Sequence, residues 1–256
     1  MIEIKGSKKL LLKTIKRAGI LVLKSYGRVK SIRAKDHESY VTEVDIASEK
    51  LIISAIRKKF PKHDIVSEES AATKNNSDFK WYIDPIDGTH NFIRGFPLFG
   101  VSIGLEYRGK MALGAMNMPL LGEIYFAEKG KGAFLNGKRI SVSNKNKMKE
   151  AFIVSDLMLR YGPEKKLEAL KRMRGKIHDM RAIGCAVAGY AFVAKGVADA
   201  YYTLETFPWD AAAGTLIVQE AGGKVTGLKG EKFDISSGKY LASNGRLHEG
   251  MLGFFR

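Results

Sequence analysis

The stretch WYIDPIDGTHNF, residues 81–92, decides the fold because its character changes at its centre. The first three residues are aromatic or β-branched and favour a pleated, half-buried strand, whereas the residues that follow break a strand and open a turn. Asp84 and Asp87 are separated only by Pro85 and Ile86, so both acids can turn inward at the strand end. Pro85 lacks an amide donor and fixes the local φ, which leaves the Ile86 carbonyl free as a third oxygen ligand.

The composition fits a self-folding globular protein with a basic surface. The 256 residues are 45% hydrophobic, and 43 basic against 27 acidic side chains give a formal charge of +16. That charge suits either nucleic acid or a phosphorylated small molecule as a partner. The basic runs at 144–149 and 170–176 contain no interleaved aromatic residues. We therefore interpret them as solvated faces and expect no nucleic-acid partner.

The beginning of the chain and its cysteine content restrict location and chemistry. The first residues, MIEIKGSKKLLLKTIKRAG, lack the apolar core and the cleavage site of a secretory signal. No apolar run approaches the roughly 20 residues that a membrane-spanning helix needs. Cys185 is the only cysteine, which excludes an internal disulfide and a cysteine-rich zinc site. A cytoplasmic protein without a membrane partner is expected.

The hydrophobic pattern divides the chain into an α+β half, residues 1–140, and an α/β half, residues 141–256. No linker rich in Pro, Ser or Gly separates them, so an extensive interface is expected. In the first half the pattern predicts helices over 7–26 and 42–60, a strand over 64–70 and a second strand that begins at Trp81 and ends in the paired acids. An antiparallel meander over 98–107, 110–118 and 122–128 and a hairpin turning at Asn136-Gly137 follow. The second half alternates: strand 151–155, helix 163–174, strand 177–182, helix 185–195, strand 198–203, helix 209–221 and strand 223–226.

Acidic side chains gather at the ends of these predicted elements. Carboxylates brought together in a folded core repel one another, so such a cluster normally persists because cations occupy it. Without a cysteine or histidine cluster, the donors favour Mg²⁺ or Mn²⁺ over zinc. Any one of these acids could be an ordinary surface residue, and Asp210 by itself could be a helix cap. The acids are Asp45, Glu68, Glu69, Asp84, Asp87 and Asp210.

Gly88 and Thr89 follow the paired aspartates directly. They can begin a short helix whose unpaired amides attract a phosphate group. Metal-binding carboxylates and an anion site would then share one loop, which indicates chemistry on a phosphoryl group.

Four motifs in order carry a resemblance to a known family: VTEVD at 41–45, EE at 68–69, DPIDGTHNF at 84–92 and WDAAAG at 209–214. Together they resemble the inositol monophosphatase family of metal-dependent, lithium-sensitive sugar-phosphate phosphatases, over nearly the whole chain. The resemblance implies a layered αβαβα sandwich, a homodimer and a small phosphate ester as substrate.

The resemblance also assigns roles, with two or three Mg²⁺ per site and Mn²⁺ as a possible substitute. Glu68, Asp84 and the Ile86 carbonyl would bind one ion, Asp84, Asp87 and Asp210 a second, and Glu68 would contribute to a weaker third. A metal-activated water, oriented by Glu68 and Thr89 with Asp45 behind Thr89, would attack the phosphate. The implied substrate contacts are Gly88, Thr89, Arg181, Gly184, Cys185, Ala186, Thr203 and Glu205.

Substrate choice is where the sequence departs from the family pattern. Inositol monophosphatases place a glutamate for the inositol hydroxyls where this chain has Thr203, and the nearest acid is Glu205. Cys185 stands where the family usually has threonine. Loss of the carboxylate should relax or redirect specificity.

Several functions therefore remain open at this point. Inositol monophosphatase ranks first and fructose-1,6-bisphosphatase, or a dual activity, close behind. A second phosphate would need cations near the pocket, for which Arg160, Lys165, Arg172 and Arg181 are candidates. A 3′-phosphoadenosine nucleotide phosphatase ranks third, and an inactive homologue that binds RNA is the alternative outside the enzymes.

Overall fold

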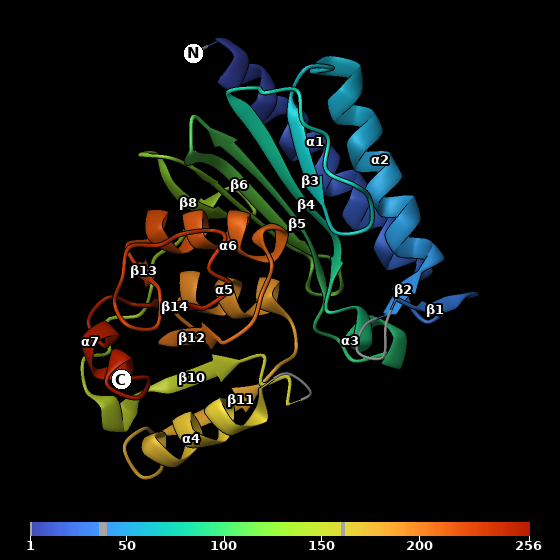
Figure 1. The fold of residues 1–256 in the computed structure, drawn as a ribbon. Helices are drawn as coiled ribbons and strands as arrows, with labels where there is room; N and C mark the ends of the chain where they lie inside the picture. Colours follow the sequence, from blue (N-terminus) through green and yellow to red (C-terminus); the bar gives the residue numbers. More distant parts are fainter. Residues whose placement is uncertain (1, 36–39, 160–161) are drawn as a thin grey trace.

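A seven-stranded sheet forms the first half of the protein (Figure 1). The structure is a computed structural model, and it describes residues 2–35, 40–159 and 162–256. All neighbouring strands of this sheet are antiparallel except the first pair, so the predicted meander is confirmed. In spatial order the strands are β3 (Asp64–Ser67), β4 (Phe79–Asp87), β5 (Gly100–Tyr107), β6 (Lys110–Met118), β7 (Glu123–Glu128), β8 (Gly132–Leu135) and β9 (Lys138–Arg139).

Two long helices, α1 (Ile2–Ser25) and α2 (Glu43–Lys59), cover one face of this sheet. Their apolar residues join those of β4, β5 and β6 in one buried cluster. The short strands β1 (Ile32–Ala34) and β2 (Tyr40–Thr42) pair with each other. Thr42 caps α2 as predicted, and its hydroxyl accepts from the amides of Val44 and Asp45.

A five-stranded sheet forms the second half. Its order is β11 (Asp179–Ala182), β10 (Phe152–Ser155), β12 (Ala200–Thr203), β14 (Tyr240–Ser243) and β13 (Lys224–Thr226). The helices α5 (Ala186–Ala194) and α6 (Pro208–Glu220) lie between the two sheets, and α4 (Pro163–Met173) and α7 (His248–Leu252) pack on the far face of the smaller sheet. The sequence did not predict β1, β2, β14 or α7.

The order of layers is therefore helix, sheet, helix, sheet, helix, which confirms the expected αβαβα sandwich (Figure 1). Helix α6 lies very close to the large sheet, because a Cβ on Gly114 would come 2.9 Å from the Ala213 carbonyl oxygen. The small residues of the 209–214 motif allow this approach. Within the described residues, no helix is both long and apolar enough to cross a bilayer.

Candidate active site

Asp84 and Asp87 occupy an irregularity inside β4. The strand pairs with β5 regularly up to Asp84 opposite Ser102, and the register then shifts before Asp87 meets Gly100. The sequence predicted a turn after the strand, whereas the structure contains a bulge within it, and β4 continues to Asp87. A bulge re-aims side chains without ending the ladder. The Pro85 carbonyl is fixed by the Ser48 hydroxyl at 3.1 Å.

The chain leaves β4 through Gly88, which has φ 79° and begins helix α3 (Thr89–Arg94). The Thr89 hydroxyl lies 2.9 Å from the Ile86 carbonyl and 3.4 Å from Asp45 Oδ1, so it can donate to either oxygen. The other Asp45 oxygen accepts the Thr42 amide at 2.9 Å. Asp45 is buried behind Thr89, which is the position that the family resemblance implies.

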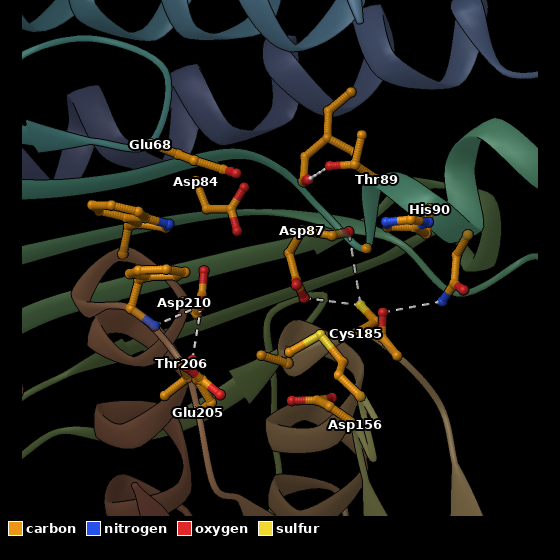
Figure 2. A pocket seen from close by; sticks show the side chains of 18 of the residues that line it. Glu68, Asp84, Asp87, Thr89, His90, Asp156, Cys185, Glu205, Thr206 and Asp210 are labelled. Carbon is orange, nitrogen blue, oxygen red and sulfur yellow. Dashed lines mark hydrogen bonds between the residues drawn. The ribbon is translucent and has the colours of Figure 1, made fainter. Parts of the chain in front are cut away.

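Glu68 follows β3, and its amide donates to the Ile83 carbonyl of β4 at 3.3 Å. This bond places the Glu68 side chain beside Asp84 (Figure 2). Lys35 bridges the two glutamates, with its Nζ 2.7 Å from Glu68 Oε1 and 2.5 Å from Glu69 Oε1. Lys35 therefore neutralises part of the acidic cluster from the rim.

Asp210 reaches the site from the other half of the protein, on the first turn of α6. Its Oδ2 accepts the Thr206 hydroxyl at 2.8 Å and the Phe207 amide at 2.9 Å. The helix-cap interpretation is thus correct for this oxygen, while the carboxyl group also contacts Asp84 across the pocket. The same side chain serves the helix and the site.

One cavity of about 200 Å³ between the two halves is lined by Glu68, Asp84, Asp87, Thr89 and Asp210, among others. Burial and the neighbouring acids raise the pKa of Asp84 well above its usual value, and burial with the charge of Asp210 raises that of Asp87 to about 8. Burial also raises the pKa of Asp210 and of Glu68, and Lys35 opposes the shift at Glu68. Ionising all four acids together is therefore unfavourable unless a cation shares the pocket.

The donor set fits a hard divalent cation. All the donors are oxygens, and Asp84 Oδ1 is buried without a hydrogen-bond partner among the described residues, which leaves a costly unused acceptor. Within that part of the chain, no three acidic, histidine or cysteine side chains already converge in the geometry of a finished metal site. The carboxylates would have to draw closer together around an ion.

Most of the predicted substrate contacts also line this cavity. Gly88 and Thr89 lie at one end, and the segment Gly184, Cys185 and Ala186 faces them. The Cys185 thiol donates to Asp87 Oδ2 at 2.9 Å. Burial, followed by the charge of Asp87, raises the pKa of Cys185 well above its usual value, so the thiol stays protonated.

The structure places two predicted contacts elsewhere. Arg181 is mostly exposed on the edge strand β11, where it forms an ion pair with Asp179 at 2.6 Å. Thr203 is buried at the end of β12, and its hydroxyl donates to the Glu205 carbonyl at 2.9 Å. Its side chain therefore shapes the turn that carries Glu205, which does line the cavity.

Of the basic side chains proposed to bind a second phosphate, those that the structure describes lie outside this cavity. Arg160 lies outside the described residues. Lys165 and Arg172 line a neighbouring groove of about 1140 Å³, which meets the cavity at Glu205, Thr206 and Phe207. Arg172 is engaged there by Glu168, with 3.1 Å between Nε and Oε1.

Sequence reasoning missed Asp156, which follows β10 and lines the same cavity. Burial raises its pKa to about 7, although the Tyr201 hydroxyl, which donates to Oδ2, opposes the shift. No motif surrounds Asp156 in the sequence. Its position at the end of a strand of the second half was the only available signal.

Comparisons with known proteins agree with this geometry. The model of the inositol monophosphatase family matches residues 8–255. A protein of Aquifex aeolicus named fructose-1,6-bisphosphatase/inositol-1-monophosphatase is 39% identical over 240 residues, which cover 92% of this chain and 90% of that protein. The Nus factor SuhB of Pseudomonas aeruginosa is 36% identical over 94% of this chain and 92% of its own length.

Among solved structures, the IMPase of Thermotoga maritima superposes with a TM-score of 0.87 at 34% identity, and the match covers 100% of this chain and 97% of that one. Similarity thus extends through both halves and both sheets. The cluster of acids and the small cavity between the halves lie within the matched region. The protein therefore belongs to the inositol monophosphatase family and is a hydrolase of phosphate monoesters.

Proposed function

We propose that the protein is a Mg²⁺-dependent phosphomonoesterase that acts on inositol-1-phosphate and related sugar phosphates. One observation carries the proposal: acids from separate parts of the chain line one small cavity. Glu68 follows β3, Asp84 and Asp87 lie in β4, and Asp210 lies in α6. Family membership supports the phosphatase chemistry.

The chain offers oxygen ligands for two or three Mg²⁺ ions, and Mn²⁺ could replace them. Glu68, Asp84 and the Ile86 carbonyl would hold one ion, and Asp84, Asp87 and Asp210 a second. A weaker third ion would also use Glu68. When bound, the metal would lower the pKa of an attacking water and neutralise charge on the phosphate.

The remaining residues orient the reactants. Glu68 and the Thr89 hydroxyl would position the attacking water, while the Thr89 hydroxyl would donate its hydrogen bond to Asp45 and so leave the lone pairs of Thr89 Oγ1 for the water. Burial raises the pKa of Asp45 to about 6, so at neutral pH it is largely ionised and able to accept. The Gly88 and Thr89 amides would bind phosphate oxygens.

Fructose-1,6-bisphosphatase activity, alone or in addition, is the next candidate. Two observations favour it: the name of the Aquifex relative, and Thr203, which puts no carboxylate where the family binds inositol. The groove lined by Lys165 and Arg172 adjoins the cavity and could hold a second phosphate. A 3′-phosphoadenosine nucleotide phosphatase ranks third.

RNA binding is the candidate from a different class, and the charge of +16 favours it. The name of the Pseudomonas relative, Nus factor, shows that the family contains members not named for phosphatase activity. The complete set of acids argues against an inactive homologue.

A cytoplasmic location, a homodimer and inhibition by lithium complete the proposal. Unchanged activity in tens of millimolar Li⁺ would count against inhibition by lithium.

The deciding experiment measures phosphate release from inositol-1-phosphate and fructose-1,6-bisphosphate in parallel, with Mg²⁺ or with a chelator. Asp84→Asn should lower the activity on both by about 10²-fold or more, because it removes a ligand of both proposed ions. Release that continues in chelator or in this variant would refute the proposed site. If the folded protein with Mg²⁺ releases nothing and instead retains RNA in a salt-sensitive manner, the binding role replaces the enzymatic one.

A further inference from the structure

The Asp156 carboxylate is incompletely bonded in the wall of the cavity. Its Oδ2 accepts the Tyr201 hydroxyl, whereas its Oδ1 is buried and has no hydrogen-bond partner among the described residues. Figure 2 shows Asp156 beneath Cys185, on the opposite side of the pocket from Glu68. A buried carboxylate oxygen without a donor is costly, so its presence needs an explanation.

Folding does not supply that explanation. The bond from the Tyr201 hydroxyl and the nearby Cys185 amide already anchor the side chain, and a glutamine or asparagine amide could accept the Tyr201 bond without the cost of a buried charge. Within the described residues, only Asp84 and Asp156 have a buried carboxylate oxygen in this unpaired state. Asp84 has a metal role in the proposed function, and Asp156 has none.

The register of the smaller sheet shows what Asp156 faces. Strands β10 and β12 are parallel and pair Ser155 with Tyr202, so Asp156 lies beside Thr203 at the same sheet edge. The Thr203 hydroxyl is turned to the backbone of Glu205. Asp156 therefore lines the cavity from the strand beside Thr203.

We propose that Asp156 is a specificity residue, whose Oδ1 accepts a hydrogen bond from a hydroxyl of a polyhydroxylated phosphate ester. The inference rests on the proposed phosphatase function and names how that site recognises the alcohol part of its substrate. One neutral O–H donor completes the bonding of Oδ1, whereas a metal ion would require several further oxygen ligands. A site with a buried acceptor therefore favours esters that carry the matching hydroxyl, because only they gain this bond.

The test compares two esters with the Mg²⁺-loaded full-length protein: inositol-1-phosphate and phenyl phosphate, which has no hydroxyl on its leaving group. Asp156→Leu, which is close in size but accepts no bond, should lower kcat/KM for inositol-1-phosphate about 10–100-fold, mainly through KM. Phenyl phosphate should change by less than about threefold. Asp156→Asn retains an acceptor and should recover part of the loss.

Tyr201→Phe is the matched control. Like Asp156→Leu it removes the hydrogen bond between Tyr201 and Asp156, but it keeps the carboxylate. It should affect both esters equally and weakly. Thermal unfolding of each variant in chelator reports whether the fold survives independently of activity. An equal loss on both esters in Asp156→Leu, or a raised Mg²⁺ requirement measured with phenyl phosphate, would overturn the inference. If the wild-type protein hydrolyses neither ester, the proposed function fails and the inference fails with it.

Discussion

Gly88 shows how strongly a single backbone position constrains the site. Its φ of 79° is unfavourable for a residue with a Cβ, and that Cβ would lie 3.0 Å from the Leu98 carbonyl oxygen and 3.2 Å from Cys185 Cβ. Gly88→Ala should therefore lower the free energy of unfolding by about 2–3 kcal/mol, and lower phosphate release by displacing Thr89.

Gly109→Ala provides the control, because Gly109 has a similar φ of 72° but open space around it. It should cost only about 1 kcal/mol and leave activity unchanged. Denaturant unfolding and phosphate release, measured on both variants, separate the backbone strain from the contact. If Gly88→Ala loses no more stability than Gly109→Ala and keeps normal activity, the contacts with Leu98 and Cys185 do not matter.

At single residues, motifs determined what the sequence could predict. The acids at 45, 68, 84, 87 and 210 could be assigned together, because each follows or begins an element whose pattern was readable, and the structure brings them into one region. Asp156 stands outside any motif. The hydroxyl of Thr203 and the guanidinium of Arg181 were expected at the substrate, but each has a closer partner in its own turn or strand. Such local competition cannot be seen in a sequence.

At the level of elements, the structure explains why the prediction was better for some segments than others. Helices α1 and α2 and the meander have clear periodicity and caps, whereas β14 has four residues and α7 five. Both short elements depend on tertiary contacts. His248 connects α7 to two strands of the smaller sheet. Its Nδ1 lies 2.8 Å from the Ser243 hydroxyl of β14, and its Nε2 lies 2.9 Å from the Thr226 hydroxyl of β13.

This buried histidine predicts a pH dependence of stability. Burial, assisted by the charge of Lys224, lowers its pKa from 6.5 to about 4. Between those values the unfolded chain binds a proton that the folded protein does not, so the free energy of unfolding should fall as the pH is lowered from 6.5 to 4. We expect His248 to account for about 1–2 kcal/mol of that loss.

Denaturant unfolding at pH 7 and pH 4.5 should show the effect as a smaller pH difference in His248→Gln than in wild type. His178→Gln is the control, since His178 is exposed, and it should retain the wild-type difference. If His248→Gln also retains it, the acid sensitivity arises elsewhere.

For the whole molecule, the site depends on how the two halves are stacked. Asp84 and Asp87 belong to the large sheet, and Asp210 is carried by a helix that packs on the same sheet through glycine and alanine. The alternation of helices and strands predicted the second half, and the absence of a linker predicted an extensive interface between the halves. The order of strands in the smaller sheet was not predictable, because it depends on β14, which returns antiparallel between β12 and β13.

A cation bound by acids from both halves should stabilise the whole molecule. At a Mg²⁺ concentration about 100 times its Kd, binding to the folded state alone contributes about 2.7 kcal/mol, which for a chain of this length raises the Tm by about 5–10 °C. Asp210→Asn should remove most of this shift, because it deletes the ligand from the second half. Glu249→Gln removes an exposed acid paired with Lys224 and should keep the full shift. Calorimetry with Mg²⁺ and with chelator measures all three proteins, and an undiminished shift in Asp210→Asn would mean that the ions are held by the first half alone.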